Sequence, residues 1–147
     1  QLDEALALSR QISEVFGEAM ALHQLGEAAL RGGDPDTAIR QVAAGLALRR
    51  DLDDRDGLAL SLEALGGLLR SSAPTLAARL LGAADGLRLR HRLPVPGERL
   101  AERDAVLADL GAALGAEAAE AARLAGGYAA LDSIVDEALE HIDQRFR

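Results

Sequence analysis

Four aspartates make the densest cluster of groups that could bind a cation: Asp51, Asp53, Asp54 and Asp56. Set against an EF-hand loop that ends at Glu63, the cluster supplies carboxylates at the third and fifth ligand positions. Leu52 falls at the first position, however, and cannot ligate calcium. We therefore interpret the cluster as a solvated turn whose negative charge favours the start of the next helix, and we predict no metal site.

Two of the three histidines have a glutamate four residues away, as in His23 with Glu27 and His141 with Glu137. That spacing places each pair on one helix face, but two ligands are too few for a stable zinc site. The sequence has no cysteine and no lysine, which excludes thiolate nucleophiles and Schiff-base or P-loop lysines. It also has no Gly-x-Ser-x-Gly motif. We predict a domain that is not an enzyme and holds no cofactor.

Basic residues concentrate at Arg88, Arg90 and Arg92, with Arg99 and Arg103 further along the chain. Such a group could meet a phosphate or an acidic partner. Leucines interleave with these arginines, and no aromatic residue lies among them for base stacking. The formal net charge of −8 also disfavours nucleic acid and anionic membranes. We expect a solvated helix end whose arginines pair with acidic neighbours.

The composition indicates that helices position these groups. Of the 147 residues 49% are hydrophobic but only 2% aromatic, so the core must be built from leucine, alanine, valine and isoleucine. The stretch from Gly17 to Leu48 has an apolar helix face on each side of Gly32-Gly33-Asp34-Pro35, where glycine suits the end of one helix and proline the start of the next. Gly26, Ala38 and Gly45 are small enough for two helices to cross closely. The predicted fold class is all-α.

Sliding the chain against itself by about 40 positions, a period typical of stacked helical hairpins, aligns several residues with identical ones. Leu6, Gly17 and Gly26 recur in this way as Leu46, Gly57 and Gly66. We predict that residues 1–92 form helical repeats, divided into a lone helix at 1–15, a hairpin at 17–50 and a hairpin at 57–91.

The stretch Leu93-Pro94-Val95-Pro96-Gly97 interrupts this pattern, because each proline disfavours helix for the residue before it. Beyond it we predict three helices that end at Gly115, at Gly126-Gly127 and near the last residues; their ranges are 98–114, 116–124 and 132–144. Stacked arrays need atypical terminal units for solubility. We interpret residues 93–147 as C-terminal capping helices of the same domain.

Several small and apolar residues have tetratricopeptide-like spacing: Gly26, Ala29, Gly33, Asp34-Pro35, Ala38, Val42 and Gly45. The segments 61–65, 77–84 and 93–99 further resemble the C-terminal helical-repeat region of actinobacterial multidomain transcriptional regulators, large predicted ATPases of the LuxR or cyclase-associated type. The likeness continues at 113–115 and 135–139. It implies tetratricopeptide-like stacked hairpins (an α-α superhelix) in a signal-transducing protein whose ATPase and DNA-binding modules lie elsewhere. Ala119 and Arg123 depart from it, where that family tends to carry aromatics.

Tetratricopeptide geometry would align one row of side chains along a concave face: His23, Glu27, Leu30, Arg31, Leu60, Glu63 and Arg70. The row lacks the lysine-and-asparagine set with which chaperone-binding repeats clamp a peptide carboxylate. The predicted function is a non-catalytic protein-interaction or regulatory domain, a fragment of a larger regulator. Its expected partner is another protein or another domain of the parent chain, and not nucleic acid or membrane.

Two alternatives stay open. In the first, the concave face senses a small-molecule effector, which a closed apolar pocket with convergent polar groups would favour and an open surface would not. In the second, the exposed face formed by Leu2, Leu6 and Ile12 pairs with a second copy, giving a homodimer through the N-terminal helix. No apolar run approaches the roughly 20 residues of a membrane span, and no basic, apolar-cored leader is present. We therefore expect a cytoplasmic protein.

Overall fold

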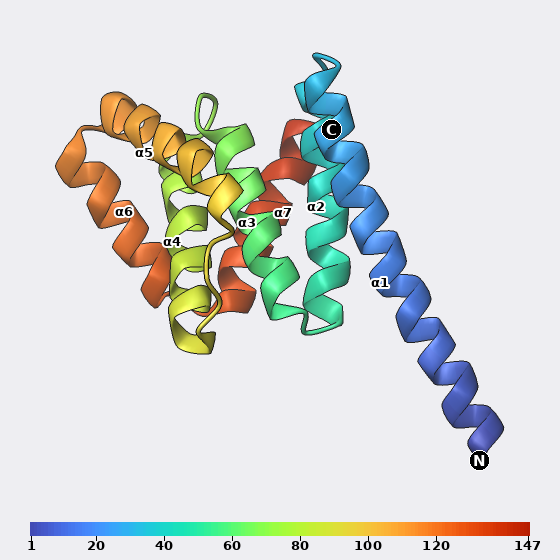
Figure 1. The fold of residues 1–147 in the computed structure, drawn as a ribbon. Coiled ribbons are helices and arrows are strands. Elements are labelled where there is room, and N and C mark those ends of the chain that lie inside the picture. The colour runs from blue at the N-terminus through green and yellow to red at the C-terminus, as the bar shows by residue number, and fades with distance from the viewer.

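The computed structural model describes residues 1 to 147 and is entirely helical, without a strand, which confirms the all-α prediction (Figure 1). Seven α-helices and one short 3₁₀ helix follow one another along the chain: α1 (Leu2–Arg31), α2 (Pro35–Asp51), α3 (Arg55–Leu69), α4 (Pro74–His91), η1 (Gly97–Arg99), α5 (Leu100–Leu114), α6 (Ala116–Tyr128) and α7 (Leu131–Arg145).

In the turns that precede α2 and α3, an aspartate side chain caps the start of the next helix. The Asp34 carboxylate accepts a 3.1 Å hydrogen bond from the Thr37 N–H, and Pro35 occupies the first position of α2. The Asp54 carboxylate accepts an equivalent bond of 3.1 Å from the Gly57 N–H at the start of α3. Each carboxylate satisfies a backbone donor that the first helical turn leaves free. One aspartate of the acidic cluster is therefore a helix cap.

The N-terminal helix differs from the prediction. We expected a lone helix at 1–15 and a hairpin that begins at Gly17, but α1 is one helix of 30 residues. Nothing lies within 4 Å of the position that a Cβ of Gly17 would take. A single glycine costs a helix only about 1 kcal/mol relative to alanine, and good helix formers flank it here. The helix ends instead at Gly32-Gly33, where Gly33 has φ +81°, a conformation that glycine adopts readily.

Two glycines 40 residues apart in the predicted register occupy matching positions in the two hairpins. A Cβ on Gly26 of α1 would lie 2.8 Å from Val42 Cγ2 and 3.4 Å from the Ala38 carbonyl oxygen on α2. A Cβ on Gly66 of α3 would lie 3.0 Å from Leu81 Cγ and 3.2 Å from the Ala77 carbonyl oxygen on α4. In each hairpin, therefore, the missing side chain lets the two helices approach closely.

The C-terminal helices pack back onto the hairpins. α6 lies along α4, α7 contacts α2 and α4, and α5 contacts α3, α4 and α6 (Figure 1). The predicted stop at Gly126-Gly127 is wrong, because α6 continues to Tyr128. A Cβ on Gly126 would overlap the carbonyl oxygen of Arg79, and one on Gly82 would overlap that of Arg123. These glycines serve the crossing of α4 with α6, where the two backbones touch.

The apolar core lies among α2, α3 and α4, and α5 and α7 cover it. Leu46, Leu62 and Leu65 are fully buried there, together with Leu110 of α5 and Ile134 of α7. α1 adds little to this core, since only three of its residues are buried, all in its C-terminal half: Ala19, His23 and Gly26. Its N-terminal half extends away from the other helices (Figure 1).

Candidate binding groove

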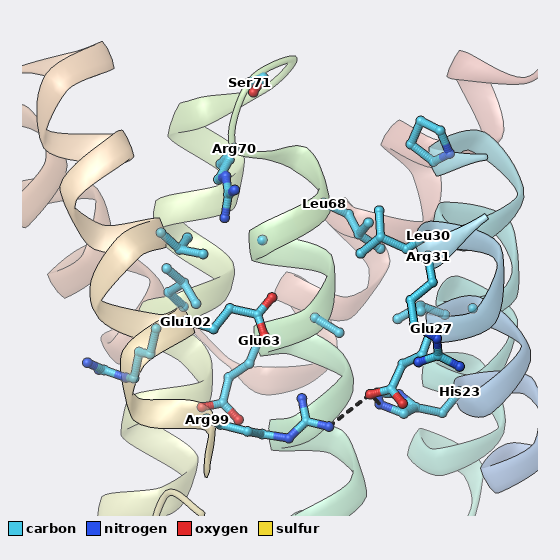
Figure 2. Close-up of a pocket in the computed structure, with 18 residues that line it drawn as sticks. His23, Glu27, Leu30, Arg31, Glu63, Leu68, Arg70, Ser71, Arg99 and Glu102 are labelled. Carbon is cyan, nitrogen blue, oxygen red and sulfur yellow. Dashed lines mark hydrogen bonds and ion pairs between the residues drawn. The ribbon is translucent and has the colours of Figure 1, made fainter. Parts of the chain in front are cut away.

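A groove of about 470 Å³ separates α1 from α5, with α3 between them (Figure 2). α1, α3 and the η1–α5 segment supply most of its lining, and the buried side chains of Val42 and Leu81 reach its base. All but one of the predicted concave-face residues line it: His23, Glu27, Leu30, Arg31, Glu63 and Arg70. Leu60 is half-buried and lies outside the groove.

An ion pair bridges one end of the groove. Arg99 Nη2 of η1 donates a 3.0 Å hydrogen bond to Glu27 Oε1 of α1 (Figure 2). The same carboxylate oxygen lies 3.3 Å from His23 Nε2, one helical turn earlier. The His23 side chain is almost wholly buried, and neither of its ring nitrogens has a hydrogen bond of good geometry. It is therefore a buried polar group whose nearest polar partner is the Glu27 carboxylate.

The surroundings of His23 and Glu27 lower the pKa of both side chains. Burial lowers the pKa of His23 from its ordinary 6.5, and the nearby Arg49 charge lowers it further, while Glu27 only partly opposes them. Burial would raise the pKa of Glu27, but the hydrogen bond from Arg99 and the neighbouring charges outweigh it, so that this pKa falls below its ordinary 4.5. Near neutral pH the groove therefore presents an uncharged imidazole beside an ionised carboxylate.

The second predicted group, the basic patch, does not exist as a patch. Arg88 has only 5% of its side chain exposed and donates to Glu63 Oε1 through Nη2 at 2.6 Å. Its Nη1 also donates to the Pro94 carbonyl oxygen at 2.9 Å. Arg90 and Arg92 are exposed, and Arg90 donates to the Gly127 carbonyl oxygen at 3.4 Å. Arg88 thus pairs with an acidic neighbour as we expected, but it is not solvated, because the glutamate of α3 lies directly beneath it.

The α5 wall of the groove was not recognised from the sequence as part of the site. It consists of Glu102, Arg103 and Val106 of α5, together with Arg99 of η1. Arg103 is paired with Asp85 of α4, and Arg70 Nε on α3 lies 3.1 Å from Asp109 Oδ2 of α5. The only sequence signal was the arginine concentration itself, which carries no information about which helix it will face.

A second buried arginine was also missed. Arg49 of α2 donates to Ser61 Oγ at 2.7 Å and to the Gly57 carbonyl oxygen at 3.3 Å, both on α3. Burial lowers the pKa of Arg49, although the charges of Asp54 and Asp56 oppose the shift. The acidic cluster was the available signal for it, because a buried guanidinium needs carboxylates close by.

The side chains that line the groove determine what kind of ligand it could bind. The lining includes guanidinium and carboxylate groups, and six of the 18 lining residues are hydrophobic, so that the groove suits a ligand with both charged and apolar parts. No three histidine or carboxylate side chains converge as metal ligands would.

Comparison with known proteins finds no relative: no family model, no curated protein and no solved structure matches this chain. None of its helices is long and apolar enough to cross a membrane.

Proposed function

We propose that this chain is a non-catalytic interaction and regulatory domain, built from tetratricopeptide-like stacked hairpins with a C-terminal cap. In this proposal the groove over α3 binds a peptide segment of a partner protein or of another module of a larger cytoplasmic regulator. The observation that carries the proposal is the convergence of residues from α1, α3 and α5 on one groove, with charged groups at its ends and Leu30 and Leu68 between them (Figure 2).

The character of the lining favours a peptide over a small apolar effector. The volume of about 470 Å³ lies within the usual range of ligand sites, but such sites are enclosed and mostly apolar. Here two thirds of the lining residues are charged, polar or small, and Leu30 is 47% exposed at the rim. A peptide with alternating charges can exchange hydrogen bonds with Glu102 and Arg31, for which the fold supplies no ion-pair partner.

The proposal is tested by selecting peptides that bind the chain from a random library and mapping them by amide chemical-shift changes. We expect changes at Glu27, Ala64 and Gly67, and a loss of at least about tenfold in affinity for Leu30→Glu. The matched control is Leu124→Glu on α6, because Leu124 is 51% exposed and lies outside the groove. Peptides that map elsewhere, or an equal loss in both variants, would overturn the proposal.

One observation favours effector sensing as a second candidate. His23 borders the groove beside Glu27, whose carboxylate is 43% exposed, and a small molecule that hydrogen-bonds to this carboxylate would act directly on the buried imidazole beside it. In that case a small-molecule library, screened by thermal shift, should yield compounds that stabilise the chain but not its His23→Gln variant. If such compounds displace no selected peptide, the two candidates use different parts of the groove.

A further inference from the structure

The N-terminal half of α1 is a helix with no helix packed against it. Residues 1–14 are all exposed, Val15 is half-buried, and the first buried residue is Ala19. In Figure 1 this half projects well beyond the end of α2. Its surface is therefore separate from the groove, and what it binds does not depend on the function proposed for the groove.

An apolar row on this half continues the face that packs on α2. Ala19, His23 and Gly26 are the buried residues of α1, and a helix brings residues three and four apart onto one face. Continued toward the N-terminus, the same row contains Phe16, Ile12, Leu8 and Ala5. Leu8, Ile12 and Phe16 are 58%, 42% and 41% exposed. A contiguous apolar stripe of this kind marks an interaction site, whereas scattered exposed leucines do not.

The charged side chains around this stripe indicate which kind of helix could pair with it. The charged side chains of residues 1–18 are four carboxylates and one guanidinium, and none of them makes an ion pair: Asp3, Glu4, Arg10, Glu14 and Glu18. Glu4 and Glu18 lie on the same edge of the stripe, roughly four helical turns apart. Antiparallel pairing of two copies would place Glu4 of one copy beside Glu18 of the other, and like charges there oppose the pairing.

We propose that residues 2–18 of α1 form a docking face for an amphipathic helix of a partner protein, one whose apolar stripe is flanked by lysine or arginine. The apolar row supplies the buried contact, as in other helix-on-helix recognition. The carboxylates of Glu4 and Glu18 along one edge of the stripe favour a basic partner over a second copy of this chain, because flanking charges set partner choice between paired helices. This docking face is distinct from the groove in both position and charge.

The test uses a synthetic helical peptide of about 18 residues, which spans ~27 Å of helix, with leucine along one stripe and lysine on both flanks. Binding is measured by fluorescence anisotropy at 0.15 M salt, beside a scrambled peptide of the same composition and a peptide with glutamate flanks. We expect the lysine-flanked peptide to bind at least about tenfold more tightly than either of the others. Equal binding of the scrambled peptide would overturn the proposal.

Two variants localise the contact. Leu8→Glu puts a charge into the stripe and should weaken the lysine-flanked peptide at least about tenfold. Ala7→Glu adds the same charge to the same exposed part of α1 but on its polar face, and it should leave the affinity unchanged or slightly raised. Equal losses in both variants would mean that net charge, and not the stripe, governs binding.

The chain and its two variants are also examined by light scattering without any peptide. We expect a monomer. A stable dimer that Leu8→Glu dissociates and Ala7→Glu does not would identify a second copy as the occupant and overturn the basic-helix proposal. Because neither variant touches the groove, these results leave the peptide-binding function proposed for the groove to its own test.

Discussion

Arg99 of η1 and Glu27 of α1 form a 3.0 Å ion pair although 72 residues separate them in the chain. The pair joins the segment after the two prolines to the first hairpin, and it closes one end of the groove (Figure 2). It joins α1 to the region that we predicted as a cap, in addition to the packing of α7 on α2.

The first prediction concerns the energy of this link. Arg99→Gln and Glu27→Gln should each destabilise the fold modestly, and a double-mutant cycle should give a coupling of roughly 0.2–1 kcal/mol, because pairs this exposed are screened by water. The side chains are 31% and 43% exposed. Urea denaturation measures the cycle. Since the folded-state pKa of Glu27 lies below its ordinary 4.5, its contribution should be complete above that pH and be lost as the pH falls further.

The second prediction concerns Arg88, which we expected in a solvated patch and found buried against Glu63. Arg88→Met should cost up to about 3–5 kcal/mol, because it leaves the Glu63 carboxylate, whose side chain is only 13% exposed, without its partner. Arg90→Met, two residues on and exposed, should change the free energy of unfolding by less than about 0.5 kcal/mol.

A double variant separates this explanation from a simple loss of packing. Arg88→Met with Glu63→Leu removes both charges, so it should be more stable than Arg88→Met alone. If Glu63→Leu gives no recovery, the arginine acts through its apolar stem and not through the ion pair.

The sequence predicted the local features of the fold well and the long-range ones poorly. Asp34-Pro35 and Pro74 begin helices where turn chemistry requires them to, and helical spacing put His23 and Glu27 on one face, which lines the groove. Such signals act within a few residues. The partner of Arg88 and the α5 wall of the groove depend on contacts between segments far apart in sequence, which no local pattern encodes.

The glycines show most clearly that local sequence does not determine which segments pack together. Gly17 and Gly126 both suggested helix ends, yet both lie inside helices. Gly17 meets no neighbour, while Gly126 meets the Arg79 backbone. In the sequence, a glycine that ends a helix cannot be distinguished from one that a helix merely tolerates or from one that lets another backbone approach. Only the segment that packs against the glycine distinguishes these cases.

The third prediction uses this difference. Gly82→Ala and Gly126→Ala should each destabilise the fold by about 1–3 kcal/mol or more, because the added methyl group meets a backbone carbonyl that cannot rotate away. Gly111→Ala is the control: it lies in α5 with nothing within 4 Å of its Cβ position, so it should stabilise by roughly 0.5–1 kcal/mol. Thermal unfolding of the three variants measures the effects. Stabilisation by Gly82→Ala would disprove the close crossing of α4 with α6.

The last prediction follows from the buried imidazole of His23. Its folded-state pKa lies below the ordinary 6.5, so between those two values the unfolded chain holds a proton that the folded chain does not. The free energy of unfolding should therefore fall as the pH drops through about 6.5, by at most ~1.4 kcal/mol per pH unit from this one group. Urea titrations between pH 8 and pH 5 measure the slope. His23→Gln should flatten it. An NMR titration midpoint for His23 at or above 6.5 would contradict the buried, neutral imidazole, since protonation would then favour the folded chain.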